Sequence, residues 1–380
     1  MKIKSVAAYP LRCALEQPFS YSQKWFKHRT ALLVKVVTDE GLYGWGEVFC
    51  HDAWPALAAL IERVYQPLIL GQDPLSREVI WDKLYNWTRD YGQKGLTTAA
   101  LSGIDIALWD ILGKVAGLPV YQLLGGAFRD RVQAYATGMY LTEPAIDDPS
   151  VLADEALSYV EQGFKAVKMK VGFGLDRDTV YVHSVREAIG DSTGLMIDAN
   201  HAYDAATAIA LGRALEDCDI GWFEEPVVPE DIEGYCRVRR ALDISIAGGE
   251  AEFSRYGFRE LISRGAVDIV QPDICITGGL SETGKIAVLA QTWHVRCMPH
   301  VWGTGVALAA ALHLIASLPD QPPSLNPLPK LLEMDRTENP IRENILVEPI
   351  QLVEGDALVP QGPGLGIEID EAVLESFRQS

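Results

Sequence analysis

The chain has 380 residues, a formal net charge of −19, 48% hydrophobic residues and 22% charged residues. This length exceeds the needs of one small core and suits a barrel of about 250 residues with a companion domain. The acidic balance and the lack of a Lys/Arg stripe argue against a nucleic-acid partner, and no apolar stretch is expected to reach the roughly 18 residues of a membrane span.

Residues 1–128 predict a small α+β domain. Thr30–Val37 alternates with β-branched residues and Leu42–Val48 returns after a turn, so an antiparallel meander is expected near the start of the chain. Residues 54–125 have helical patterns, and Leu101–Leu112 carries apolar residues three and four positions apart. We therefore expect a sheet followed by helices, placed before the main domain.

Residues 129–355 predict a parallel α/β barrel, because short apolar strands alternate with amphipathic helices. The expected strands are Ala134–Thr137, Ala166–Val171, Leu195–Asp198, Trp222–Glu224, Ile246–Gly248, Ile269–Gln271 and Arg296–Pro299. The expected helices include Pro149–Glu161, Asp204–Leu215 and Gly279–Trp293. Residues 356–380 form a third segment, which contains the Gly/Pro-rich run Pro360–Gly366 and is expected to return to the first domain.

Charged residues recur at strand ends in the barrel region. Asp198, Glu224, Glu250, Asp273 and His300 follow one another at intervals of 26, 26, 23 and 27 residues, about the length of one βα unit. The C-terminal ends of barrel strands carry the catalytic loops, so these side chains are expected to converge on one mouth.

Asp198, Glu224 and Glu250 predict a metal site. Three carboxylates without interspersed His or Cys form an all-oxygen ligand set, which favours Mg²⁺, with Mn²⁺ as an alternative. A single acidic residue at a strand end is more often a cap or an ion-pair partner, but the equal spacing of all three favours metal binding. Glu225 competes with Glu224; strand phase favours Glu224, with Glu225 as a supporting partner.

Two basic groups predict proton transfer. Lys168 and Lys170 lie two positions apart on one strand face, so each cation favours the neutral form of the other. We assign Lys170 as the base and Lys168 as the group that tunes it and contacts a substrate carboxylate. On neighbouring strands, Asp273 and His300 predict a second base, because an Asp–His hydrogen bond fixes the imidazole tautomer.

Substrate contacts are predicted from loops near this mouth. Asn200 and His201 lie just beyond Asp198, and Trp302 follows His300 in the next loop along. Two loops of the first domain, about residues 19–29 and 49–54, are expected to form a lid. Within them, Lys24 and Arg29 are candidates to bind a distal carboxylate; a solvated loop charge is the alternative reading of each.

These motifs together resemble the enolase superfamily, in its mandelate racemase/muconate-lactonizing subgroup. The runs that carry the resemblance span nearly the whole chain and are ALSGIDIALWDILGK (100–114), VKMKVG (167–172), MIDAN (196–200), WFEEP (222–226), AGGE (247–250), QPD (271–273) and PHVWGTG (299–305). The resemblance implies a modified (β/α)₇β TIM-like barrel, of α/β class, with an N-terminal α+β capping domain. It places the same residues at the metal and base positions, and adds Glu333 as an acidic partner that orients or donates to the developing oxyanion.

The resemblance implies Mg²⁺-dependent removal of a proton alpha to a carboxylate. Further runs, including WFEEPVVPE (222–230) and QGPGLGIE (361–368), resemble members that open an aldaric acid lactone to a 2-keto-3-deoxy acid. An acid-sugar dehydratase is the main alternative; a racemase or epimerase and a non-catalytic binding protein are less favoured. The expected partners are a small acid sugar or its lactone and further copies of the chain, as a homo-oligomer.

Six scattered cysteines show no zinc-like spacing and are expected to be reduced core thiols. The start of the chain runs into strand-like sequence, which does not resemble a secretory apolar segment. A cytoplasmic protein without a membrane segment is therefore expected.

Overall fold

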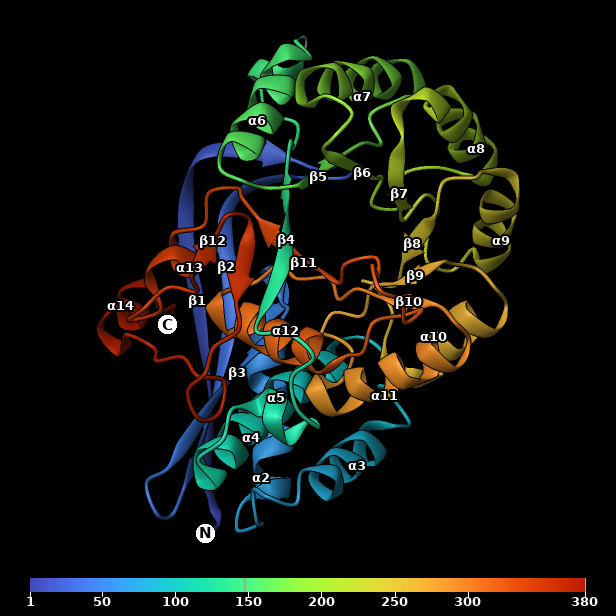
Figure 1. The fold of residues 1–380 in the computed structure, drawn as a ribbon. Helices are drawn as coiled ribbons and strands as arrows, with labels where there is room; N and C mark the ends of the chain where they lie inside the picture. Colours follow the sequence, from blue (N-terminus) through green and yellow to red (C-terminus); the bar gives the residue numbers. More distant parts are fainter. Residues whose placement is uncertain (147, 380) are drawn as a thin grey trace.

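A computed structural model describes residues 1–146 and 148–379 and shows an N-terminal antiparallel sheet with helices beside a parallel α/β barrel (Figure 1). The predicted fold class is confirmed. The barrel forms the ring of strands and helices in Figure 1, and the N-terminal domain lies along one side of it.

The N-terminal sheet has the order β1-β2-β3, with strands β1 (Ile3–Ser20), β2 (Trp25–Thr38) and β3 (Tyr43–Val48) paired antiparallel. Both faces of β2 are buried, and its side chains alternate between two cores. Leu32 and Val34 differ by two positions and share the core of the N-terminal helices, whereas Leu33 packs in the core of the barrel. This alternation explains why the middle of the strand, residues 31–34, is a continuous apolar run.

The helices of the N-terminal domain are η1 (His51–Ala53), α1 (Trp54–Ala59), η2 (Leu60–Tyr65), α2 (Gln66–Ile69), α3 (Arg77–Thr88), α4 (Leu96–Ala116) and α5 (Val120–Leu123). The central helix, α4, packs against β3 so closely that a side chain at Gly46 would clash with the carbonyl oxygen of Gly103. By length and composition α4 could cross a membrane, which corrects the sequence expectation, but 89% of its apolar window is buried inside the protein. A helix buried to this extent is a core helix of the folded domain.

The barrel contains eight parallel strands and seven helices within the described residues. Its strands are β4 (Arg131–Gly138), β5 (Ala166–Lys170), β6 (Gly194–Asp198), β7 (Ile220–Glu224), β8 (Ile246–Gly248), β9 (Ile269–Val270), β10 (Arg296–Cys297) and β11 (Leu331–Asp335). Its helices are α6 (Ser150–Glu161), α7 (Leu175–Ile189), α8 (Ala205–Ala214), α9 (Ile232–Ala241), α10 (Ser254–Ser263), α11 (Gly279–Thr292) and α12 (Gly305–Ser317). Strands β4 to β10 pair in chain order and β11 pairs with β4, which is the (β/α)₇β arrangement.

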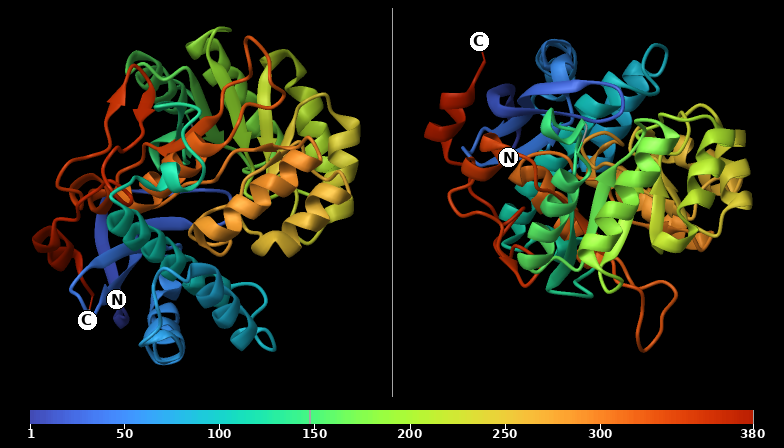
Figure 2. Two further views of the ribbon diagram at one scale, coloured as in Figure 1. Left: turned by 60° about the horizontal axis from the view of Figure 1, so that its bottom comes forward. Right: turned by 90° about the horizontal axis from the view of Figure 1, so that it is seen from above.

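Short elements connect these parts: η3 (Pro144–Ile146), η4 (Glu216–Cys218), α13 (Pro340–Asn344), β12 (Leu352–Val353), β13 (Asp356–Leu358) and α14 (Glu371–Phe377). Strand β13 adds antiparallel to β4, so the last segment first extends the barrel sheet. The chain then reaches the N-terminal domain, where the N–H of Gln379 donates to the carbonyl oxygen of Pro10. Figure 2 shows α14, in red, beside the N-terminal strands.

The region expected to be a lid loop over residues 19–29 is mostly strand. Strand β1 continues to Ser20 and β2 begins at Trp25, so the connection is a short turn at the tip of a long hairpin. The tip is bound to the barrel, because Ser22 Oγ donates to the carbonyl oxygen of Ala199 at 2.9 Å and Gln23 Nε2 to that of Asn200 at 2.8 Å. The hairpin therefore closes over the strand end that carries Asp198.

Candidate active site

The predicted metal and base residues meet at the C-terminal end of the barrel. Lys170, Asp198 and Glu224 are the last residues of β5, β6 and β7, and the strand register pairs Lys170 with Asp198 and Asp198 with Glu224. Glu250 follows β8 by two residues. Parallel register thus turns a regular spacing in the sequence into a row of neighbouring side chains.

The three carboxylates suit a divalent cation. One oxygen each of Asp198, Glu224 and Glu250 lies within 4.8 Å of the other two. Glu250 Oε2 is buried without a hydrogen-bond partner, which leaves a lone pair free at this point. All donors are carboxylate oxygens, the ligands that Mg²⁺ prefers. Glu225, the competing residue, adopts φ +41° and does not belong to this set.

Lys168 does not line the active-site cavity. Its side chain is fully buried, and its ammonium lies 2.5 Å from Glu224 Oε1 and 2.8 Å from Glu333 Oε1. The predicted contact between Lys168 and a substrate carboxylate does not fit this position. Lys168 instead holds two carboxylates in place.

Lys170 does line the cavity, and its Nζ lies 2.5 Å from Asp198 Oδ2. Burial is the largest influence on the pKa of Lys170 and lowers it, but Asp198, Tyr140 and Glu250 together outweigh burial and raise the pKa. The protein groups by themselves therefore favour the ammonium form, contrary to the neutral lysine expected from the sequence. A cation held by Asp198 would oppose this effect, because it would offset the carboxylate charge next to Nζ.

His300 and Asp273 form the expected pair. His300 Nδ1 lies 2.7 Å from Asp273 Oδ2, and Nε2 faces Glu250 Oε2 at 3.6 Å. Burial lowers the pKa of His300, but the carboxylates of Glu250, Glu333 and Asp273 outweigh burial and raise it to about 10. The Asp273 contact leaves Nε2 as the ring atom directed at the cavity.

Glu333 lies on β11 and lines the cavity. Its oxygens accept hydrogen bonds from Thr137 Oγ1 at 2.7 Å and from the N–H of Val301 at 3.1 Å. Burial raises its pKa, but Lys168, His300 and Lys170 prevail and lower it. The structure thus favours a carboxylate that accepts hydrogen bonds, and the protonated donor considered from the sequence does not fit it.

A cavity of about 190 Å³ adjoins these groups and is lined from both domains. The predicted residues that line it are Lys170, Asn200, His201, Glu250, His300, Trp302 and Glu333. The lining residues that sequence analysis did not single out are Tyr21, Phe26, Phe49, His51, Tyr140, Ala251 and Ile276. Of these, Tyr21, Phe26, Phe49 and His51 fall within the two expected lid segments, which is the signal that could have identified them.

The predicted lid cations lie elsewhere. Arg29 is buried, its guanidinium lies 2.6 Å from Asp335 Oδ2, and it stacks 4.3 Å from the ring centroid of Trp302. The ammonium of Lys24 lies 4.9 Å from the ring centroid of Phe26. Neither side chain lines the cavity in the described part of the chain. Arg29 therefore acts as a support for Trp302, and the predicted clamp of a distal carboxylate is not formed.

Trp302 of the barrel and His51 of the lid line the cavity and have hydrogen-bonding capacity free. The indole Nε1 of Trp302 is buried without a hydrogen-bond partner. Burial, helped by the ammonium of Lys24, lowers the pKa of His51 to about 3, so its imidazole is neutral at ordinary pH. These two groups could form hydrogen bonds to a polar ligand in the cavity.

This architecture is that of a capped-barrel enzyme. Residues 4–125 match the mandelate racemase / muconate lactonizing enzyme N-terminal domain, and residues 151–373 match the enolase C-terminal domain-like family. The chain belongs to the enolase superfamily, in its mandelate racemase / muconate lactonizing enzyme group.

Three relatives illustrate the similarity. The D-galactarolactone cycloisomerase of Agrobacterium fabrum is 47% identical over 378 residues, covering 100% of this chain and 99% of that protein. The arabinonate dehydratase of Saccharolobus solfataricus is 36% identical, covering 90% of this chain and 89% of that one. The crystal structure of the 3,6-anhydro-D-galactonate cycloisomerase from Zobellia galactanivorans superposes with a TM-score of 0.90 at 43% identity, covering 100% of both chains.

Proposed function

We propose that this enzyme removes the proton alpha to the carboxylate of an acid sugar and opens the ring of an aldarolactone by β-elimination. The observation that carries the proposal is the convergence of Lys170, His300 and the carboxylate cluster, through Glu250, on one cavity lined from both domains. An acid that binds there presents its α-carbon to both bases. The product of the elimination and tautomerisation is a 2-keto-3-deoxy acid.

Asp198, Glu224 and Glu250 are the proposed ligands of Mg²⁺, with Mn²⁺ as an alternative. Two observations support this assignment: all three ligands are carboxylate oxygens, and Glu250 Oε2 has no hydrogen-bond partner. Enolase-superfamily sites combine a Lys or His base with Mg²⁺. When bound, the ion stabilises the negative charge that develops on the substrate carboxylate.

Lys170 and His300 are the proposed acid–base pair. One removes the α-proton while the bond between the β-carbon and the ring oxygen breaks, and the ring oxygen leaves as a carboxylate. The resulting enol then loses its hydroxyl proton and receives a proton at the β-carbon from the conjugate acid of a base. The sum is an isomerisation, so two proton-transfer groups are sufficient.

The other cavity residues orient the substrate in this proposal. Asn200 Nδ2 donates to Glu250 Oε1 at 3.2 Å, so Asn200 links the metal cluster to the loop that contacts substrate. The neighbouring imidazole of His201 is held by Gln23 Nε2 at 2.9 Å from Nδ1. The unpartnered indole N–H of Trp302 is a donor for a substrate hydroxyl or carboxylate.

A dehydratase is the second candidate, because relatives such as the arabinonate dehydratase share the family and 36% identity. That reaction would expel hydroxide, which must be protonated as it leaves, and the imidazolium form of His300 would supply the proton and become neutral imidazole. A lactone carboxylate is a better leaving group and does not require this step. The substrate test therefore separates the two functions.

The test follows D-galactarolactone and open-chain galactarate by proton NMR in deuterium oxide, with and without added Mg²⁺. Metal-dependent conversion of the lactone to a 2-keto-3-deoxy acid, with the open acid unchanged, supports the cycloisomerase. Turnover of the open acid supports the dehydratase. If neither substrate exchanges its α-proton or reacts, both assignments fail for this substrate pair.

We also propose that the enzyme works in the cytoplasm, where its six free thiols would stay reduced. The homo-oligomeric state remains a prediction that size-exclusion chromatography with light scattering checks.

A further inference from the structure

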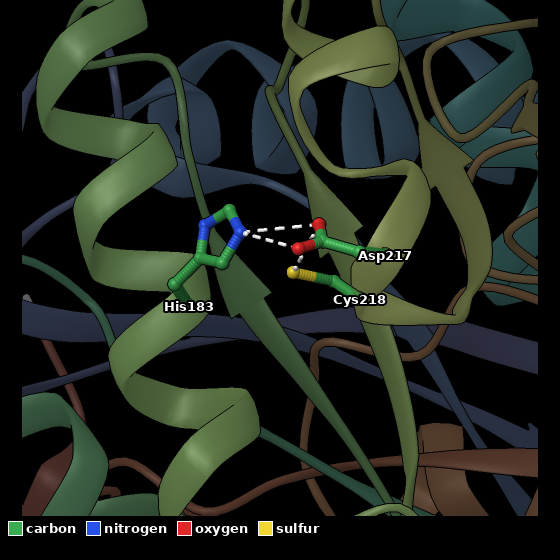
Figure 3. Close-up of side chains that lie close together, drawn as sticks. All are labelled: His183, Asp217 and Cys218. Atoms are coloured by element: carbon green, nitrogen blue, oxygen red, sulfur yellow. Dashed lines mark hydrogen bonds and ion pairs between the residues drawn. The ribbon is translucent and has the colours of Figure 1, made fainter.

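A second cluster of metal-ligating side chains lies on the outside of the barrel, between α7 and η4 (Figure 3). His183 comes from α7, whereas Asp217 and Cys218 come from η4. One potential ligand atom of each residue lies within 4.8 Å of the other two. None of the three lines the active-site cavity, so this cluster is distinct from the all-oxygen site.

Two of the three ligand–ligand separations in the cluster are close to those of a tetrahedral site. His183 Nε2 lies 3.1 Å from Asp217 Oδ1, and Cys218 Sγ lies 3.7 Å from the same oxygen. Zinc bonds of about 2.0 Å to N and O and about 2.3 Å to S place tetrahedral ligands roughly 3.3–3.5 Å apart. Both separations fall within a few tenths of an ångström of that range.

The imidazole presents the correct nitrogen. His183 Nδ1 lies 2.8 Å from the carbonyl oxygen of Thr179, an acceptor, so Nδ1 carries the hydrogen and Nε2 is directed at the cluster. A backbone carbonyl on the second ring nitrogen is the usual support of a metal-ligating histidine. His183 Nε2 and Asp217 Oδ1 lie 3.1 Å apart. Either a proton or a metal ion held between these two atoms would stabilise this arrangement.

The two elements of the cluster are fastened together by Arg186. Its buried guanidinium, one turn after His183 on α7, donates to the carbonyl oxygens of Cys218 at 2.8 Å and Asp219 at 3.2 Å. It also donates to two further carbonyl oxygens at 2.7 Å each. The backbone of η4 is therefore held against the helix that supplies the histidine before any ligand binds.

We propose that His183, Asp217 and Cys218 bind a zinc-type divalent cation, with water in the fourth position. Thiolate and imidazole ligands select Zn²⁺ over Mg²⁺, so this site and the carboxylate cluster would take different metals. The His183 and Asp217 side chains are 41% and 74% exposed, which gives an ion and its water access. Because η4 leads directly into β7, the ion would fasten α7 to the strand that ends in Glu224.

The test uses Co²⁺ as a spectroscopic probe of the full-length protein after treatment with EDTA and addition of excess Mg²⁺ to occupy the carboxylate cluster. We expect one equivalent of Co²⁺ to give a thiolate-to-cobalt charge-transfer band in the near ultraviolet, together with intense tetrahedral visible bands. An oxygen-only site cannot give the thiolate band. Cys218→Ser should abolish it, and His183→Asn should weaken Co²⁺ and Zn²⁺ binding by at least about tenfold.

Matched controls are available in the chain. Cys13→Ser removes a partly exposed thiol, and His28→Asn disrupts an exposed His–Asp pair with a 2.9 Å contact; both should leave the band unchanged. Zn²⁺ should raise the melting temperature of the unaltered protein but not that of Cys218→Ser, with Mg²⁺ in excess for both. Absence of the band, or its persistence in Cys218→Ser, would overturn the site even if the active-site assignment holds.

Discussion

Glu47 offers a test of how the capping domain supports the catalytic loops. It lies on β3, and its buried carboxyl accepts hydrogen bonds from the N–H of Thr304 at 2.9 Å, from Thr304 Oγ1 at 2.6 Å and from the N–H of Ala307 at 2.9 Å. These groups form the N-terminus of α12, which begins five residues after His300. One side chain of the first domain therefore caps a barrel helix next to the proposed base.

Replacing Glu47 by Ala removes the acceptor of three buried donors. A buried donor left without a partner costs about 1–3 kcal/mol, and water entering the vacated space would recover part of that cost. We expect a loss of about 3–5 kcal/mol in the free energy of unfolding, and about half as much for Glu47→Gln, which keeps one carbonyl oxygen. Scanning calorimetry should show the corresponding decrease in melting temperature.

The same change should lower kcat by roughly 10–100-fold, because a displacement of about 1 Å in a catalytic group has effects of that size. Asp110→Ala is the matched control. Its buried carboxyl accepts the N–H groups of Trp45 at 3.0 Å and Leu365 at 2.9 Å, away from the His300 loop, so it should lose stability while kcat stays unchanged. Equal loss of kcat in both variants, or unaltered stability in Glu47→Ala, would refute the reasoning.

Four further outcomes are expected. Burial raises the pKa of Glu47 to about 7 from its ordinary 4.5, so stability should fall by about 3 kcal/mol as pH rises through that interval. Between about pH 5 and about pH 8, the loss of stability measured from melting curves should be smaller in Glu47→Gln than in the unaltered protein by about this amount, because other buried carboxyls such as Asp105 contribute to both. If Lys170 is the abstracting base, Lys170→Ala should stop deuterium exchange at the substrate α-carbon and His300→Asn should retain it; the reverse pattern assigns the base role to His300. Glu250→Gln should lower Mg²⁺ affinity at least about tenfold by calorimetric titration while the circular dichroism spectrum is retained, and unchanged affinity would remove it from the ligand set. Arg29→Ala should cost about 1–3 kcal/mol in urea unfolding, because Asp335 loses one of its two arginine partners and keeps Arg342 at 2.8 Å, with Arg29→Lys costing less.

The barrel could be predicted from the sequence because its signals are local and periodic. A strand end recurs at nearly constant spacing, and parallel register then places Asp198 beside Glu224 without further information. The choice between Glu224 and Glu225 is a question of strand phase, so it too could be made from sequence. These parts of the site follow from the βα repeat itself.

Partners distant in the sequence could not be predicted in this way. Arg29 looks like a free lid cation until the fold brings Asp335 to it across 306 positions. Lys168 looks like a substrate contact until Glu224 and Glu333 are found on either side of it. A sequence shows that a charge is present; the fold determines whether that charge is already paired. Cys218 is the buried free thiol that the sequence predicts, but the sequence could not show that His183, on another element, lies close to it.

The capping domain has two separable effects on the site. The hairpin tip and the 49–54 segment supply part of the wall of the cavity, including His51, and under the proposed function these are the positions at which we expect substrate choice to vary. Glu47, by contrast, lies on β3, does not line the cavity, and accepts two of its three hydrogen bonds at the start of α12 from backbone N–H groups, which any residue other than proline would present. Substrate choice can therefore vary at the lid while the geometry of the His300 loop is preserved, because different residues of the same domain control the two properties.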